Sequence, residues 1–181
     1  MSKPSARQFR GIGVSPGVAC APALVMRWDF PQVPDRTVPK EKIDSEVRRL
    51  REAVEHVVSL LRDLGERVLQ RAGPEESRIF DAQILMTQDE EFLTSVENLI
   101  RNNQFSAETA YEFRALELRS HWSSSARLRD RLADLHSIQI RMIHRLLGAR
   151  TDSEIWSVPG DEQVIVVAHE LSPGLTVQLD R

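Results

Sequence analysis

The densest group of ionisable side chains lies in residues 75–91, where six acidic residues stand against one basic residue and give a local charge of −5. The acids are Glu75, Glu76, Asp81, Asp89, Glu90 and Glu91. Acids gathered in this way attract a basic partner through long-range electrostatics. The residues alone leave a second interpretation open, in which the acids only solvate a helix and Ile79 and Met86 belong to the core.

A segment of opposite charge follows, with seven arginines against Asp130 and Asp134 in residues 119–150 and a local charge of +5. One interpretation is a nucleic-acid-binding stripe. Trp122 is the only aromatic residue of the segment, and the arginines are spread around the expected helix. We therefore expect this helix to pair with its acidic neighbour, and no nucleic acid to bind.

Residues that could do covalent or metal chemistry are not grouped in the sequence. The five histidines lack partners at the spacing of metal ligands, and Cys20 is the single cysteine. No apolar run reaches the roughly 18 residues of a membrane span. We expect no metal, no catalytic residue, no membrane insertion and a cytoplasmic location. His169 and Glu170, which follow an expected strand, are interpreted as a loop pair.

Helical elements must position the acidic segment. Apolar residues at alternating steps of four and three predict a long helix over residues 43–68, ended by Gly73 and Pro74. Its seam is Ile43, Val47, Leu50, Val54, Val57, Leu61, Leu64 and Val68. Further helices are predicted over 75–87, 90–101 and 107–121, the last with Ser106 as its N-cap. A second long helix is predicted over 126–147, ended by Gly148, and its apolar stripe should pack against the first.

Strand signals lie only towards the two ends of the chain. Residues 9–26 predict two short strands around a turn at Ser15 to Gly17. Residues 162–168 predict a buried strand, and Ser172 and Pro173 then predict the start of a helix. The fold class is mainly α with a partial α/β portion. We divide the chain into a β segment at 1–35, a helical subdomain at 36–149 and a return into the α/β portion at 150–181.

Three motifs in this order carry a family resemblance. They are Gly11-Ile12-Gly13-Val14-Ser15-Pro16-Gly17-Val18-Ala19, then Ile79-Phe80-Asp81-Ala82-Gln83-Ile84-Leu85-Met86 with Asp89-Glu90-Glu91, and then residues 164–173. The chain resembles the N-terminal part of the enzyme I family, the phosphoenolpyruvate-protein phosphotransferases of the bacterial sugar phosphotransferase system. The resemblance implies a bundle of helical hairpins inserted into a swivelling phosphohistidine domain.

The resemblance also implies that the bundle docks HPr, a small phosphocarrier with a basic rim. The implied docking residues are Glu75, Glu76, Ile79, Gln83, Met86, Asp89, Glu90, Glu91 and Arg141. Ile79, Gln83 and Met86 would form the apolar centre of this surface. Arg78 departs from the family pattern on the docking helix, and Ser137 and Gln139 depart from the pattern around Arg141.

The phosphorylated histidine of the family lies in a Gly-Gly-x-Thr-Ser-His loop that would follow Arg181, so the chain alone is expected to be inactive. The resemblance assigns phosphoenolpyruvate, magnesium and homodimerisation to a C-terminal part of the intact protein. One alternative is a noncatalytic interaction module or regulator derived from this family. Another is a related phosphoenolpyruvate- or pyruvate-utilising kinase, and the sugar, nitrogen and dihydroxyacetone pathways all stay open.

Overall fold

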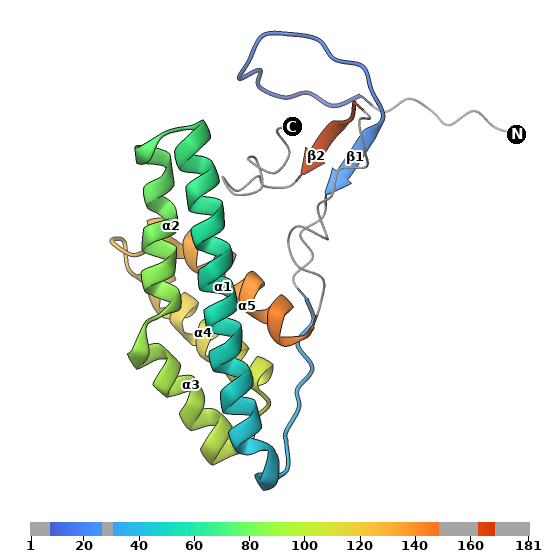
Figure 1. Ribbon diagram of the computed structural model, residues 1–181. Coiled ribbons are helices and arrows are strands. Elements are labelled where there is room, and N and C mark those ends of the chain that lie inside the picture. Colours follow the sequence, from blue (N-terminus) through green and yellow to red (C-terminus); the bar gives the residue numbers. More distant parts are fainter. Residues whose placement is uncertain (1–7, 27–30, 149–162, 169–181) are drawn as a thin grey trace, which may run out of the picture.

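The computed structural model describes residues 8–26, 31–148 and 163–168 (Figure 1). Within these residues five α-helices form a bundle, and two short strands form a sheet. The helices are α1 Ile43–Arg71, α2 Pro74–Thr87, α3 Glu90–Asn103, α4 Ala107–Ser124 and α5 Leu132–Leu146. The strands are β1 Ala23–Met26 and β2 Ile165–Ala168, and the 3-10 turns η1 Lys40–Lys42 and η2 Arg129–Arg131 precede α1 and α5. The predicted class, mainly α with a partial α/β portion, is confirmed.

The long helix α1 is the centre of the bundle, because it contacts each of the other four helices. The predicted seam is confirmed, since its residues from Leu50 to Val68 are buried. Leu50, Val57 and Leu61 are fully buried. Burying an aliphatic side chain of this size stabilises a fold by about 1.5–3 kcal/mol before the entropy cost is counted. The predicted contact between the two long helices is also present, between α1 and α5.

Turn chemistry at residues 72–74 reverses the chain between α1 and α2. Gly73 has φ 106°, a conformation that side chains with a Cβ rarely adopt, and Pro74 occupies the first turn of α2. Further along the pair, Gly65 of α1 lies so close to Phe80 of α2 that a Cβ there would be 3.2 Å from the Cβ of Phe80. The glycine therefore lets the two helices approach closely.

Side-chain caps set the starts of α3 and α4. The Asp89 carboxylate accepts a hydrogen bond of 2.8 Å from the Phe92 N–H, and the Ser106 hydroxyl accepts one from the Thr109 N–H. The predicted N-cap at Ser106 is thus confirmed. Gln104, between the helices, is left-handed with φ 57°.

The last helix begins later than the sequence predicts, at Leu132 rather than near residue 126. Ser125 is extended, and the carbonyl of Ser125 accepts bonds from Leu128 and Arg129 in a tight turn. Residues 126–131 are mostly charged and contribute nothing to the buried core, so no packing favours a longer helix there. The predicted end is confirmed by Gly148, which is left-handed with φ 65°.

The sheet differs from the prediction in two respects. Residues 8–26 contain one strand, not a hairpin, and its partner is the distant β2, with Ala23 opposite Ile165 in parallel register. The predicted burial of the second strand is also wrong, because Ile165 and Val167 are exposed. Within the described residues the sheet has two strands, which leaves apolar side chains of β2 uncovered. Residues 169–173 lie outside the described part of the chain, and the three-part division remains a prediction.

Candidate functional site

The acidic side chains of residues 75–91 are exposed on α2 and α3. Glu75 and Glu76 lie in the first turn of α2, and Asp89, Glu90 and Glu91 lie at the start of α3. Carboxylates in the first turn of a helix are stabilised by the partial positive charge of its N-terminus. The fold therefore places negative charge at the starts of α2 and α3, which lie at opposite ends of α2 (Figure 1).

The expected apolar centre of this surface requires correction. Gln83 is buried, and its Nε2 donates a hydrogen bond of 3.0 Å to the Asp134 carboxylate of α5. Ile79 and Met86 are half-buried and pack against the core. The large apolar side chain that α2 does present to solvent is Leu85, which is 73% exposed. The face of α2 that packs against the bundle is therefore centred on Phe80, Gln83 and Thr87, and not on the opposite side from Gln83 as the docking hypothesis requires.

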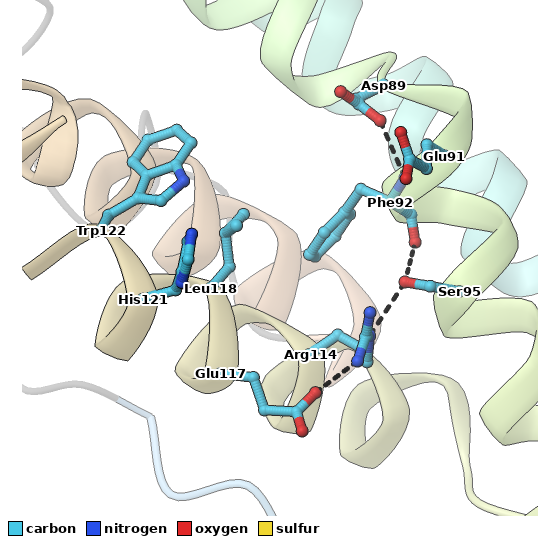
Figure 2. Close-up of a pocket in the computed structure, with 9 residues that line it drawn as sticks. All are labelled: Asp89, Glu91, Phe92, Ser95, Arg114, Glu117, Leu118, His121 and Trp122. Atoms are coloured by element: carbon cyan, nitrogen blue, oxygen red, sulfur yellow. Dashed lines mark hydrogen bonds and ion pairs between the residues drawn. The ribbon is translucent and has the colours of Figure 1, made fainter. Parts of the chain in front are cut away.

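A groove between α3 and α4 adjoins the acidic side chains (Figure 2). It has a volume of about 570 Å³, and Phe92, Leu118 and Trp122 supply its apolar wall. Carboxylates at its edge come from Asp89, Glu91 and Glu117. An apolar hollow with an acidic edge suits a basic partner that also presents an apolar side chain.

Hydrogen bonds hold the floor of the groove in place. Arg114 Nε donates to the Ser95 hydroxyl at 2.9 Å, which joins α4 to α3, and Arg114 also pairs with Glu117. The Phe92 ring packs edge-on against Tyr111, with ring centroids 5.4 Å apart. The sequence did not indicate this groove, because its residues come from two helices whose facing sides become known only when they pack.

The acids are not all equally available to a partner. Arg51 of α1 pairs with Glu90 at 2.9 Å and also with Glu97, so it partly neutralises the start of α3. The Asp89 carboxylate caps α3 by accepting a hydrogen bond from the Phe92 N–H, while Glu91 lies at the edge of the groove. Glu75, Glu76 and Glu91 are thus among the acids available to attract a cation from outside.

Arg141 does not belong to the exposed surface. It is buried in α5, where Nη1 donates to the Ser137 carbonyl at 3.0 Å and to the Ser137 hydroxyl. The expected pairing of the basic segment with α2 is not seen for Arg119, Arg129 or Arg131. Their partners are Gln139, the Ser123 carbonyl and Asp134 respectively.

The described residues include no group of three or more His, Cys, Asp or Glu placed to hold a metal ion. Their helices also include none long and apolar enough to cross a membrane. The acidic side chains and the groove offer shape and charge for recognition. We name the exposed Glu75, Glu76 and Glu91, the side chain of Leu85 and the groove together the acidic surface.

Comparison with known proteins places the chain in a family. A family model described as the N-terminal part of PEP-utilising enzymes matches residues 10–131, about two thirds of the chain. The chain belongs to the PEP-utilising enzymes. The match includes the first four helices of the bundle and thus the whole of the acidic surface.

Individual relatives of this family agree with the assignment. The chain is 30% identical to the phosphoenolpyruvate-protein phosphotransferases of Listeria monocytogenes and Bacillus subtilis, and 32% identical to that of Streptomyces coelicolor. These alignments cover 95–97% of the chain but 30% of each relative. The chain thus spans less than a third of the length of the curated PEP-utilising relatives that it matches.

Solved structures of PEP-utilising relatives share the fold. A solution structure of an Enzyme I protein superposes with a TM-score of 0.69 at 25% identity, over 81% of this chain and 59% of the other. The N-terminal domain of a nitrogen Enzyme 1 superposes with a TM-score of 0.65 at 23% identity, over 92% and 67%. The second likeness shows the fold alone.

Proposed function

We propose that this chain is the N-terminal part of a phosphoenolpyruvate-protein phosphotransferase, and that its bundle docks an HPr-like phosphocarrier on the acidic surface. The observation that carries the proposal is the groove between α3 and α4 with carboxylates along its edge. A small basic carrier would meet the carboxylates of α2 and α3 and bury an apolar side chain against Phe92, Leu118 and Trp122.

Docking of this kind would contribute directly to phosphoryl transfer between two proteins. The transition state of phosphoryl transfer is loose, so catalysis rests mainly on positioning the donor and the acceptor and on balancing charge. In this proposal the bundle holds the carrier, and a histidine of the longer protein carries the phosphoryl group. Phosphoenolpyruvate and magnesium are proposed to act on parts of the longer protein outside this chain.

Titration calorimetry with the HPr-like carrier of the same organism tests docking, at low and at high salt. We expect binding that weakens as salt rises, because the attraction is between exposed charges. The double variant Glu76→Lys/Glu91→Lys should weaken binding by about tenfold or more, since both reversals face the basic partner. Neither acid has a hydrogen bond or ion pair among the contacts described above, so the cost to the fold should be limited to the lost interaction with each helix N-terminus, about 0.3–1 kcal/mol per site.

A matched control distinguishes the acidic surface from the net charge of the chain. Glu52 and Glu55 are exposed on α1 and neither lines the groove, so the double variant Glu52→Lys/Glu55→Lys makes the same change in net charge outside it. It should keep the wild-type affinity within about twofold. Equal loss of binding in both double variants would contradict the proposed surface, and no binding by the wild-type chain would contradict docking itself.

A further inference from the structure

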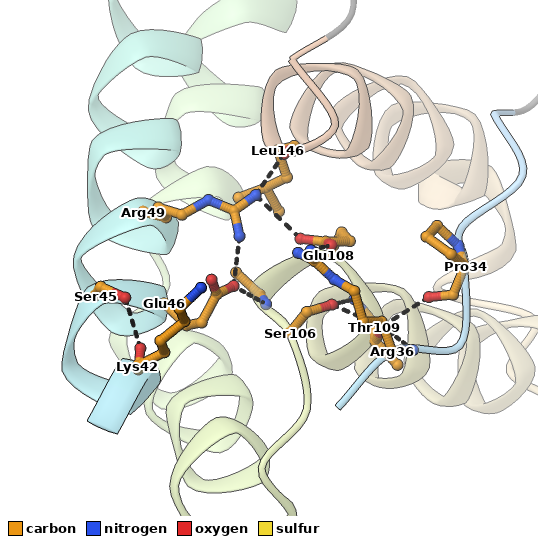
Figure 3. Close-up of polar contacts among 11 residues, drawn as sticks. Pro34, Arg36, Lys42, Ser45, Glu46, Arg49, Ser106, Glu108, Thr109 and Leu146 are labelled. Carbon is orange, nitrogen blue, oxygen red and sulfur yellow. Dashed lines mark hydrogen bonds and ion pairs between the residues drawn. The ribbon is translucent and has the colours of Figure 1, made fainter. Parts of the chain in front are cut away.

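The two chain segments that connect the bundle to the strands reach it at one place (Figure 3). Residues 31–39 lead from β1 into η1 and α1, and α5 ends at Leu146 on the way to β2. The entering segment bonds to Glu108 in the first turn of α4, and the end of α5 bonds to Arg49 in the second turn of α1 (Figure 3). The segment that enters the bundle and the helix end that leaves it are therefore held by one group of linked side chains.

Backbone pairing attaches the entering segment to the start of α4. The Val38 N–H donates to the Gln104 carbonyl at 2.7 Å, and the Ser106 N–H donates to the Arg36 carbonyl at 2.9 Å. Between these two bonds, Thr37 and Phe105 form an isolated antiparallel bridge. The Thr109 hydroxyl donates a further bond of 2.9 Å to the Pro34 carbonyl. The segment thus lies along residues 104–109 like a short edge strand.

Two buried carboxylates lie beneath this pairing. Glu108 accepts from Arg36 Nη2 at 2.6 Å and from Arg49 Nη2 at 3.2 Å, and Glu46 accepts from Arg49 Nη1 and from the Ala107 N–H at 2.9 Å. Arg49 Nη2 also donates to the Leu146 carbonyl at 2.7 Å, at the end of α5. One guanidinium therefore contacts α1, α4 and α5 together.

Arg36, Glu46, Arg49 and Glu108 form a cluster in which Glu46 and Arg49 favour each other's charged form. Burial alone would raise the pKa of Glu46, but the hydrogen bonds from Arg49 and from the Ala107 N–H outweigh it, and the pKa is lowered. Burial alone would lower the pKa of Arg49, but Glu46 and Glu108 outweigh it, and the pKa is raised. The planar fork of an arginine suits such a site, because it presents several donors in fixed directions.

We propose that Arg49 is a positioning residue. It holds the end of α5 directly and the entering segment through Glu108, which bonds to Arg36, and so it sets how the bundle is presented to the two strands. This tie follows from the contacts of Arg49 and Glu108 alone. Its use in phosphoryl transfer rests on the proposed function, because a carrier held on the bundle must be kept at a fixed place relative to the rest of the protein.

A contact that only holds the entering segment and a contact that stabilises the whole bundle differ in which backbone amides they protect from hydrogen exchange. The seam of α1 is buried independently of the cluster, so loss of a tie should free the segment at residues 34–38 and leave the helix centres protected. Loss of a general stabilising contact should raise hydrogen exchange throughout the bundle by a common factor. Amide exchange measured by NMR separates the two.

The test is amide exchange in the Arg49→Met variant of the full chain at neutral pH. We expect the Val38 and Ser106 amides to exchange at least about tenfold faster, and those of Val57 and Val96 to change by less than about twofold. Arg49→Lys keeps the charge but lacks the fork, so its effect should be intermediate. Arg62→Met is the matched control, since Arg62 is exposed on the same helix and should leave all four amides unchanged.

Unchanged exchange at Val38 and Ser106, or an equal rise at all four amides, would overturn the proposal. If Arg49→Met fails to fold, Thr109→Val gives an independent test, because it removes the bonds of the Thr109 hydroxyl to the Pro34 carbonyl, the Arg36 N–H and the Ser106 hydroxyl but leaves the ionic side chains of the cluster in place. It should speed exchange at Val38 and Ser106 by a smaller factor and leave Val57 and Val96 unchanged, and no change at Val38 and Ser106 would count equally against the tie. None of these measurements needs a carrier, so a failure of docking and a failure of the tie are separate results.

Discussion

At the scale of single residues, a hydrogen bond between α4 and α5 involves a half-buried carboxylate whose charged form is disfavoured. Gln139 is fully buried, and its Nε2 donates a hydrogen bond of 2.7 Å to the Glu112 carboxylate. Its Oε1 accepts from Arg119 at 3.2 Å. Burial raises the pKa of Glu112, and the contacts with Gln139 and Arg119 offset the rise only in part. The ionised form of Glu112 therefore opposes folding at neutral pH.

The variant Glu112→Gln should be as stable as the wild-type chain at pH 7, or more stable. A carboxyl group whose pKa is raised in the folded state binds its proton more tightly there than in the unfolded chain. Its unfavourable contribution is present at neutral pH and disappears as pH falls to the ordinary glutamate value. Thermal melts at pH 7 and pH 4 should show a gain in Tm at pH 7 that shrinks at pH 4, and a loss of Tm at pH 7 would contradict this account.

The sequence predicted which acids are charged and exposed better than it predicted which polar residues are buried. Glu75, Glu76 and Glu91 follow from composition, because carboxylates rarely enter a core. Gln83 and Gln139 are ordinary surface residues by type, and only their partners Asp134 and Glu112 on neighbouring helices allow them to be buried. Such partners cannot be recognised before the helix faces that meet are known.

At the scale of elements, the approach of α1 and α2 depends on one position without a side chain. Gly65 costs α1 some helical propensity, by about 1 kcal/mol relative to alanine, so its place in the middle of a long helix needs a compensating contact. That contact is Phe80, which is buried directly over Gly65. Gly65 thus lowers the helical propensity of α1 but allows α1 and α2 to pack more closely. The helix α2 carries Glu75, Glu76 and Leu85.

Replacing Gly65 with leucine should separate the two helices. Leucine is a good helix former, so the loss would come from displaced Phe80 rather than from propensity, and we expect a destabilisation of about 1–3 kcal/mol. The neighbouring change Glu66→Leu, at an exposed position, should alter the free energy of unfolding by less than about 0.5 kcal/mol. Chemical denaturation measures both, and equal effects would show that α2 does not depend on this close approach.

Helix extents were predictable where an apolar stripe and a stop signal coincide, as in α1 and at Gly148. The start of α5 was not, because residues 126–131 have helix-forming side chains but no core to cover, and local propensity overestimates such a segment. The predicted β hairpin in residues 9–26 was wrong for a related reason. Gly and Pro marked the turn correctly as non-helical, but they do not indicate which strand becomes the partner of β1.

At the scale of the whole molecule, the core belongs to the bundle. The buried apolar cluster and the side chains packed against it run from Val33 to Leu147, and α1 contacts every other helix. The strands β1 and β2 pair only with each other in the described part of the chain. An isolated two-stranded sheet is marginally stable, so the two parts should differ greatly in stability.

A chain of residues 31–148 should therefore fold by itself. Because it keeps the whole cluster and the segment paired with α4, its melting temperature should lie within about 5 °C of that of the 181-residue chain, a difference of about 1 kcal/mol. Circular dichroism measures both melts. A much lower melting temperature would show that residues outside this range support the bundle.

The parallel pairing of β1 with β2, which lie on either side of the helical bundle in the sequence, could not be predicted from the sequence. Residues 164–168 indicate a strand, but parallel pairing with a segment near the start depends on which surfaces remain uncovered after the bundle has formed. The resemblance to the enzyme I family supplied the expectation of an inserted bundle, and the Enzyme I structure with a TM-score of 0.69 agrees with it.

The contacts of Arg36 also bear on the order of folding. Arg36 bonds to Glu108, 72 residues later, whereas α1 and α2 are joined by a short turn. Contacts between distant residues require the closure of a long loop, so they form after the local ones that shorten it. During synthesis, residues 31–39 emerge before any helix of the bundle, yet their partners exist only once α4 has been made. We therefore expect this segment to be the first of the bundle to leave the ribosome and the last to reach its native place.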